Sequence, residues 1–412
     1  MRKGKRFIVF AIIILAITWT AAAFAAEIVI GYSGPLSGPA AEYGQDCLNG
    51  VDMAINEINA KGGINVRGQS YTLRLVSMDD HVDPKIAVNN ARQLRNEHKA
   101  IAIYNPIFGS IAAMMKINEE KRNEFLIMAY TSVPKVTEMG NKLLIGATMP
   151  FTLFAKVEAD LAWERGWRKG AMVVAAGPYG DIWRKAFGEI WVKKGGIITT
   201  DKPANYYTRT DFAKPLAEAL ASEPDFLLIG GPSATTALII EQARAKGFEG
   251  GFVMIDQAKL DALVQVMEKP LLLEGTIGLA MFKSISMPAS AAFANNYNTI
   301  YKRSLSWESV ANYTSMYALA KAIVAANTIT DVRAIRAAFP KVFPLLGDKY
   351  PMEIFGITPD GLVLAPTVVQ TMKHGKFTQP KIYIWWARTQ KEFDKIKKVS
   401  YMNPPPEWKP IQ

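Results

Sequence analysis

The sequence predicts an α/β protein built from two doubly wound parallel sheets, each at the core of its own lobe. Two consecutive series of alternating strand-like and helix-like segments support this prediction, one that starts at residue 27 and one that starts after Pro150 and ends with a strand at 252–255. Short strands that alternate with helices are typical of parallel sheets with helices on both faces. The last 130 or so residues do not repeat the pattern, so we expect two lobes rather than three.

The first series opens with an apolar strand at residues 27–32, which a loop rich in serine, glycine and proline ends. Apolar side chains at helical spacing follow at Leu48, Val51, Ile55 and Ile58, and a Lys-Gly-Gly sequence ends that helix. The rest of the series comprises strand 71–76, helix 83–97, strand 101–104, helix 111–123 and strand 125–130.

The second series has the same alternation and begins after Pro150. It comprises helix 153–165, strand 171–175, helix 182–194, strand 197–200, helix 212–221, strand 226–229, helix 234–246 and strand 252–255. The later segments are a strand at 276–281, helices at 289–301 and 310–327, and β-type segments at 367–372 and 381–387. We expect these later segments to complete the two lobes.

The first 25 residues have the composition of a secretory signal peptide. Four basic residues precede an uncharged apolar run at 7–19, and Ala23-Phe24-Ala25 offers a cleavage site. The alternative is a retained membrane anchor, but the run is shorter than the roughly 20 residues that a spanning helix needs. We therefore expect an extracytoplasmic chain that starts at Ala26.

Charge and cysteine content exclude some classes of protein. The formal charge is +11, of which four positive charges lie in the leader, and the basic residues form no run interleaved with aromatic residues. A nucleic-acid partner is therefore not expected. Cys47 is the only cysteine, so no intramolecular disulfide can form, and we expect it to be a small buried side chain.

Ligands of open parallel sheets bind outside the carboxyl ends of the strands. The loops at these places are rich in glycine, hydroxyl groups and tyrosine, and Tyr43 and Tyr179 both precede a glycine at corresponding points of the two series. The alternative is that these residues are ordinary turn and N-cap residues. Two tyrosines placed in this way predict a ligand held between the lobes.

Signals for an enzyme, a metal or a cofactor are poor. The three histidines form no Ser-His-Asp arrangement, and the sequence has neither a P-loop nor a dinucleotide-binding glycine motif. The acidic residues at 79–83 match no spaced metal-ligand motif, so we expect a loop that carries the N-cap of the next helix. We predict a non-enzymatic protein without a metal or cofactor.

Three groups of residues resemble the branched-chain amino-acid-binding family of periplasmic proteins, which serve ABC importers. They are the strand and Pro-Leu-Ser-Gly-Pro loop at 28–39, the helix and Gly-Gly-Ile sequence at 49–64, and the aspartates at 79–84. The resemblance extends from about residue 27 to residue 386. It implies a type I periplasmic-binding fold, in which three crossovers join the two lobes.

The crossovers imply that each lobe is assembled from separate parts of the chain. We expect residues 26–148 plus about 282–355 in the first lobe, and residues 149–281 plus about 356–390 in the second. Residues 391–412 are expected to be a C-terminal tail, extended around its three consecutive prolines.

The resemblance also implies a set of ligand-binding positions. Tyr43 and Tyr179 match the tyrosines of the two lobes, Asp256 falls where an acidic residue meets the ligand ammonium, and Ser132 matches a hydroxyl of the first lobe. An alternative role for Asp256 is to cap the helical stretch 260–267. The complete candidate set is Tyr43, Gly109, Ser110, Tyr130, Ser132, Tyr179, Pro232 and Asp256.

Some members of this set depart from the family pattern. Gly109 or Ser110 fits the loop that receives the carboxylate, but Tyr130 is larger than the residue usual there, and Pro232 replaces a common aromatic residue. The cysteine pair often found in the family is absent. These departures concern the identity of the ligand more than the class of protein.

The function that the resemblance implies is that of an extracytoplasmic solute-binding protein. It would bind an amino acid, branched-chain or related, between two closing lobes and deliver it to the permease subunits of an ABC transporter. The alternatives are a binder of an aromatic or short carboxylic acid and a ligand-binding sensor or receptor module.

Overall fold

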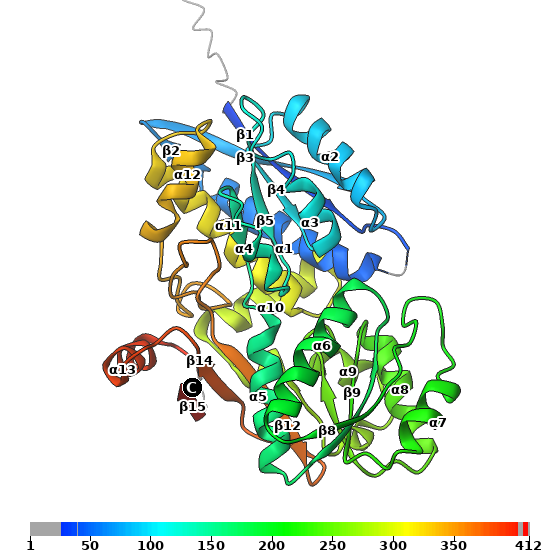
Figure 1. Ribbon diagram of the computed structural model, residues 1–412. Coiled ribbons are helices and arrows are strands. Elements are labelled where there is room, and N and C mark those ends of the chain that lie inside the picture. Colours follow the sequence, from blue (N-terminus) through cyan, green and yellow to red (C-terminus); the bar gives the residue numbers. More distant parts are fainter. Residues whose placement is uncertain (1–25, 39, 403–406, 411–412) are drawn as a thin grey trace, which may run out of the picture.

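The computed structural model describes residues 26–38, 40–402 and 407–410. Figure 1 shows two lobes, one built on each of two sheets and drawn one above the other. The predicted signal peptide and its cleavage site lie outside the described residues, as do the prolines at 404–406. No helix in the described part of the chain is long and apolar enough to cross a membrane.

The first lobe is built on a six-stranded sheet with the order β2-β3-β1-β4-β5-β6. All neighbouring strands are parallel except β2, which pairs with β3 in the antiparallel direction. The strands are β1 (Ala26–Gly34), β2 (Ile64–Val66), β3 (Gln69–Asp79), β4 (Ala102–Asn105), β5 (Leu126–Ala129) and β6 (Leu144–Gly146). The chain order reverses between β1 and β4, which is where a ligand crevice opens in such sheets.

Helices from two distant parts of the chain pack together in this lobe. The helices are α1 (Ala41–Ala60), α2 (Pro84–Asn96), α3 (Phe108–Met114), α4 (Lys135–Glu138), α10 (Pro288–Tyr301), α11 (Trp307–Ala326) and α12 (Val332–Ala338). A side chain at Gly50 of α1 would place its Cβ 2.2 Å from the carbonyl oxygen of Ser309 in α11. Glycine therefore allows the two helices to touch. Asp83 caps α2, as predicted.

The second lobe is built on a nine-stranded sheet. Eight strands follow the order β15-β14-β12-β11-β10-β9-β7-β8, and β13 pairs with β12 off this path. The strands are β7 (Lys169–Val174), β8 (Ile197–Asp201), β9 (Phe226–Gly230), β10 (Gly251–Met254), β11 (Ile277–Leu279), β12 (Thr367–Lys373), β13 (Lys376–Phe377), β14 (Lys381–Ile384) and β15 (Glu407–Pro410). The five neighbouring strands β11, β10, β9, β7 and β8 are parallel to one another. Strand β12, in contrast, is antiparallel to both β11 and β14. The prediction of a parallel sheet is thus confirmed for these five strands, but it is wrong for the edge that begins at β12.

In the second lobe the first helix precedes β7 and the others follow its strands in turn, as the alternation predicts. The helices are α5 (Phe151–Glu164), α6 (Pro178–Lys193), α7 (Ala213–Leu220), α8 (Ser233–Ala245) and α9 (Leu260–Val266). The chain passes between the lobes three times, after β6, after β11 and before β12. A parallel bridge between Gly146 and Leu362 places two of these crossing segments side by side.

The C-terminal residues differ from the predicted tail. Residues 391–412 include most of a helix, α13 (Gln390–Val399), and the edge strand β15. The Thr389 side chain accepts a hydrogen bond from the backbone N–H of Glu392, and the Glu392 side chain accepts one from the backbone N–H of Thr389. This capping box is visible in the sequence. Phe393 packs into a small apolar cluster with β12 and β14. The segment is therefore attached to the second sheet.

Candidate ligand-binding site

Three of the predicted ligand-binding residues meet at the contact between the lobes. Tyr179 lies at the start of α6, which follows β7, and Asp256 follows β10 of the same sheet. The Tyr179 hydroxyl donates a hydrogen bond to Oδ1 of Asp256. Its oxygen also lies 3.3 Å from Oγ of Ser132, which follows β5 of the first lobe. Loops at the strand ends of both sheets thus contribute to one hydrogen-bonded group.

Trp183 is a member of this group that the sequence analysis missed. It lies one turn after Tyr179 on α6, and its Nε1 donates to Oδ1 of Asp256 at 2.8 Å. The Trp183 ring stacks on Phe151, with 4.9 Å between the ring centroids. Asp256 is only 8% exposed. Its carboxylate is therefore held in place by two donors whose own positions are fixed by packing.

Tyr43 and Tyr130 form an aromatic pair on the first-lobe side. Their ring centroids are 6.2 Å apart, and the Tyr43 hydroxyl donates to the carbonyl oxygen of Pro106 at 3.4 Å. Burial raises the pKa of both hydroxyls well above the ordinary value, with smaller contributions from nearby anionic groups. Burial, followed by the charge of Asp256, raises the pKa of Tyr179 in the same way. All three tyrosines are therefore protonated and able to donate at neutral pH.

The other three predicted residues lie elsewhere. Gly109 is exposed on α3, where the nearest atom to an added Cβ is Cγ of Pro84 at 3.6 Å. Ser110 is fully buried, next to the Asp80 carboxylate. Pro232 occupies the N-cap position of α8. None of the hydrogen bonds and ring contacts described above reaches Gly109, Ser110 or Pro232.

A buried ion pair links the lobes beside Asp256, and the sequence analysis missed both of its members. Nζ of Lys259 lies 3.5 Å from Oε1 of Glu308, and the two side chains are 13% and 7% exposed. Lys259 also donates to the carbonyl oxygen of Asp256. Glu308 belongs to α11, which packs on α1 in the first lobe. The charges of the contact region therefore include one cation and at least two carboxyl groups.

The geometry of Lys259 also excludes the alternative role for Asp256. Helix α9 begins at Leu260, its N-cap position is occupied by Lys259, and no side chain caps it. The cap considered for Asp256 from the sequence is therefore not formed.

Glu158 places a third carboxyl group near Asp256. It lies on α5, is completely buried, and neither carboxyl oxygen has a hydrogen-bond partner. Burial raises the pKa of Glu158 well above its ordinary value, and the charge of Asp256 adds to the shift. Glu158 is therefore neutral at a pH where an ordinary glutamate is charged.

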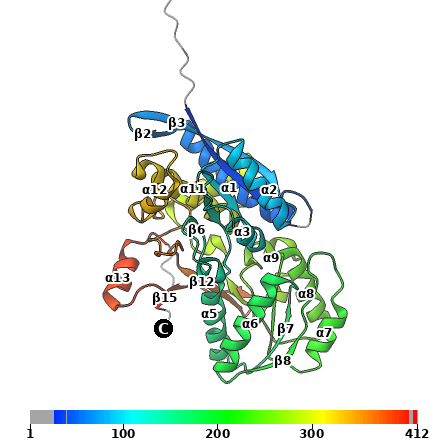
Figure 2. The same ribbon diagram turned by 45° about the horizontal axis from the view of Figure 1, so that its top comes forward.

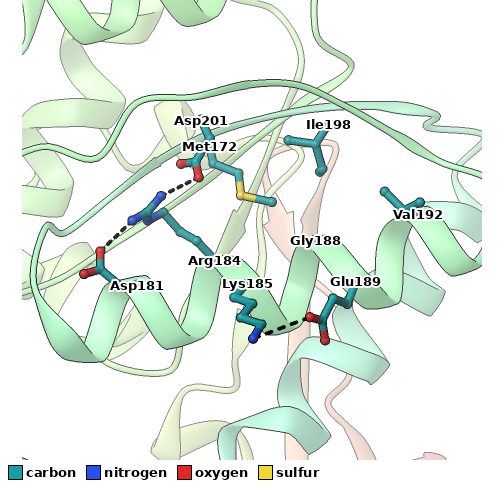
Figure 3. Close-up of a pocket in the computed structure, with 9 residues that line it drawn as sticks. All are labelled: Met172, Asp181, Arg184, Lys185, Gly188, Glu189, Val192, Ile198 and Asp201. Atoms are coloured by element: carbon teal, nitrogen blue, oxygen red, sulfur yellow. Dashed lines mark hydrogen bonds and ion pairs between the residues drawn. The ribbon is translucent and has the colours of Figure 1, made fainter.

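A separate cavity of about 320 Å³ lies on the outer face of α6, against the edge strand β8 (Figure 3). Arg184 forms ion pairs with Asp181 and Asp201 at one end of this cavity. The cavity is lined by Met172, Asp181, Arg184, Lys185, Gly188, Glu189, Val192, Ile198 and Asp201. Tyr179 and Trp183 leave the same helix towards Asp256, so the cavity does not belong to the group at the lobe contact.

Comparison with known proteins places this arrangement in a family. The model of the periplasmic binding protein family matches residues 27–375. The Leu/Ile/Val/Thr-binding protein of Salmonella typhimurium is 28% identical over 260 residues, which are 61% of this chain and 67% of that protein. An amino acid binding protein of Pseudomonas aeruginosa is 25% identical over 260 residues, 61% of this chain and 66% of that protein. The chain thus matches about two thirds of the length of these relatives.

Solved structures share the fold at lower identity. The branched-chain amino acid transporter substrate binding protein LivJ of Streptococcus pneumoniae, in complex with isoleucine, has a TM-score of 0.72 and 21% identity over 86% of this chain and 99% of its own. A solute binding protein of Rhodopseudomonas palustris in complex with benzoate has a TM-score of 0.71 and 16% identity over 86% and 95%. The chain therefore belongs to the periplasmic binding protein family, together with the leucine-, isoleucine- and valine-binding proteins.

Proposed function

We propose that this chain is the solute-binding protein of an ABC importer and binds an amino acid, branched-chain or related, between two closing lobes. The observation that carries the proposal is the Asp256 carboxylate, held on Oδ1 by Tyr179 and Trp183 and placed opposite Ser132 of the first lobe. Because both donors use Oδ1, Oδ2 is the oxygen that we assign to the ligand ammonium. A charge-assisted bond to a fixed carboxylate is a strong contact.

The remaining parts of the proposal follow from the family and the sequence. The amino-acid names of the relatives support the ligand class. The lobes comprise residues 26–148 plus about 282–355 and 149–281 plus about 356–390, and the exported chain starts at Ala26 after cleavage near Ala25. The partner is the permease of the transporter.

One observation favours a second ligand class. Lys259 is a buried cation beside Asp256, and aromatic rings surround the same region. An aromatic or short carboxylic acid would pair with Lys259 and would be repelled by Asp256. A sensor or receptor that uses the same site is the other alternative. Genome neighbours that encode permeases and ATPases would distinguish an importer from a sensor.

Calorimetric titration of wild type and Asp256→Asn separates the two ligand classes, after a thermal-shift screen has identified the best ligand. Asparagine keeps an acceptor for Tyr179 and Trp183, so the fold is retained while the charge is lost. Removing one partner of a buried ion pair costs about 3 to 5 kcal/mol, which corresponds to a loss of roughly two to three powers of ten in affinity. Asp348→Asn, at an exposed position, is the control. An amine-bearing ligand that binds Asp256→Asn as tightly as wild type removes Asp256 from the site.

Closure is tested by small-angle scattering. A ligand that touches both lobes favours the closed state by its additional contacts, so the radius of gyration should fall when the ligand is added. An unchanged radius with a confirmed ligand contradicts the closing mechanism.

A further inference from the structure

The positive charge of the chain is concentrated at its C-terminal end. Residues 26–412 carry a formal charge of +7, and residues 373–412 contain nine basic and three acidic residues. Those forty residues therefore carry +6, and the preceding residues, 26–372, carry only +1. Nearly all of this segment also lies beyond the match to the family model, which ends at residue 375.

Helix α13 arranges part of this charge as a stripe. Phe393 is buried, and Ile396 packs in the same cluster one turn later. Lys391, Lys395 and Lys398 have the spacing i, i+4, i+7, which places them on the opposite side of the helix from Phe393. All three are exposed, and no ion pair among the described residues involves any of them. We call these three residues the lysine stripe.

The acidic residues of α13 form no ion pair with the lysine stripe among the described residues. The Glu392 carboxylate accepts hydrogen bonds from the backbone N–H groups of Arg388 and Thr389 at the helix N-terminus. Asp394 accepts a bond from the amide of Gln390 at 2.8 Å. Both carboxylates are thus bound within the first turns of the helix.

The lysine stripe is presented by a fixed element. Glu353, which is buried, accepts bonds from Oγ of Ser400 at 2.6 Å and from N of Tyr401 at 2.8 Å. Strand β15 then pairs with β14 at the edge of the second sheet. In both Figure 1 and Figure 2, α13 lies at the margin of the molecule, on the side opposite α7. The helix is therefore held by Phe393 and Ile396 on its inner side and by Ser400 and Tyr401 at its C-terminal end, and it is exposed on its outer side.

Two exposed apolar side chains adjoin the C-terminal end of the lysine stripe. Val399 is 39% exposed and Tyr401 is 44% exposed. Lysines combined with apolar and aromatic side chains are typical of helices that bind the surface of an anionic membrane. A row of long, exposed lysines without ion-pair partners suits a plane of headgroups better than a shaped protein pocket, because it can meet anionic groups without a fixed register.

We propose that the outer face of α13 is a docking surface for an anionic lipid membrane, with the lysine stripe as its electrostatic anchor. Such docking would keep the protein close to the membrane and shorten its search for a transporter. The proposal goes beyond solute binding and does not depend on the ligand, so it can fail or succeed independently of the proposed function.

Co-sedimentation with vesicles tests the proposal. The full chain from Ala26 is mixed with vesicles of phosphatidylcholine alone or with about a third of phosphatidylglycerol, at low and at high salt. We expect binding to the anionic vesicles only, and its loss at high salt because surface charges are screened. Each lysine near an anionic surface contributes on the order of a fivefold increase in partitioning. Lys391→Gln, Lys395→Gln, Lys398→Gln combined should therefore reduce partitioning about a hundredfold.

A matched triple variant distinguishes an effect of the position of the lysines on α13 from an effect of the total charge of the protein. Lys116→Gln, Lys121→Gln, Lys246→Gln removes three exposed lysines from other surfaces, and we expect it to bind anionic vesicles within a few-fold of wild type. Unchanged thermal unfolding of both variants shows that the fold is intact. Equal losses in the two variants, or no binding of wild type to anionic vesicles at low salt, overturns the proposal. In the latter case an acidic protein face becomes the better partner for α13.

Discussion

Replacing Glu158 with methionine should stabilise the protein at neutral pH. Both carboxyl oxygens of Glu158 are buried without a hydrogen-bond partner, and a buried acceptor that is left unsatisfied costs about 1 to 3 kcal/mol. Methionine is close in size to glutamate and needs no partner. We therefore expect Glu158→Met to raise the free energy of unfolding at pH 7 by at least this amount.

The pH dependence of this effect has a definite sign. The pKa of Glu158 in the folded protein lies above its ordinary value of 4.5, so the folded state holds this proton more tightly than the unfolded state. The contribution of Glu158 to stability is thus fully present below pH 4.5 and falls as the pH rises towards its folded pKa. The decline amounts to at most about 1.4 kcal/mol per pH unit within that window.

Urea unfolding of wild type, Glu158→Met and Glu158→Gln from pH 4 to pH 8 measures this effect. Differences between variants are compared because titrations shared by all three proteins then cancel. Glutamine keeps the polar atoms and cannot ionise, so its advantage over wild type should vanish near pH 4 and grow with pH. Methionine should be more stable than wild type at both ends. Differences that do not vary with pH, or a methionine variant less stable than wild type at pH 7, would refute the reasoning.

Three further changes have expected outcomes. Tyr179→Phe removes a hydrogen bond to the Asp256 carboxylate, worth about 1.5 to 3 kcal/mol, so calorimetry should show an affinity at least tenfold lower; unchanged affinity would place Tyr179 outside the site. Lys259→Met leaves Glu308 buried and unpaired only when the lobes touch, and so disfavours contact between the lobes. Without ligand, scattering should therefore show a larger radius of gyration for this variant than for wild type, and the added change Glu308→Gln should partly reverse the increase. A smaller radius contradicts this. Gly50→Ala forces a Cβ to 2.2 Å from a carbonyl oxygen of α11 and should lower the midpoint of thermal unfolding, whereas an unchanged midpoint would mean that α1 can shift freely.

The strands and helices of both lobe cores could be predicted, because the spacing of apolar residues along the sequence indicates which side chains are buried. Each predicted strand from residue 27 to residue 255 corresponds to a strand of the structure, and most of the predicted helices correspond to helices. Helix α3 is an exception, because it ends at Met114, well before the predicted residue 123. Turns replace the rest of the predicted helix. Apolar spacing alone does not reveal where a helix stops when no glycine or proline marks its end.

The site could be predicted only where the chain itself carries a residue to the end of a strand. Tyr179, Ser132 and Asp256 follow strands directly, and parallel strands bring their ends to the same edge of a sheet. Ser110 shows the limit of this reasoning. It follows a strand as well, but helix α3 starts two residues before it and turns its side chain into the core. Glu308 could not be predicted, because it follows no strand directly. It lies on a helix that the second crossover returns to the first lobe, and there it contacts Lys259.

The contacts between the lobes contribute to the free-energy difference between the open and closed states, which a ligand must change in order to drive closure. Ser132 lies next to Tyr179 and Lys259 pairs with Glu308, so contacts between the lobes already satisfy groups that a ligand would also use. A ligand shifts the equilibrium between open and closed states only by the difference in its affinity for the two. A ligand that merely displaced these contacts would gain nothing from closure. It follows that the ligand must add a contact that the lobes do not already make with each other, and the Oδ2 atom of Asp256, which neither Tyr179 nor Trp183 uses, is the acceptor that can supply it.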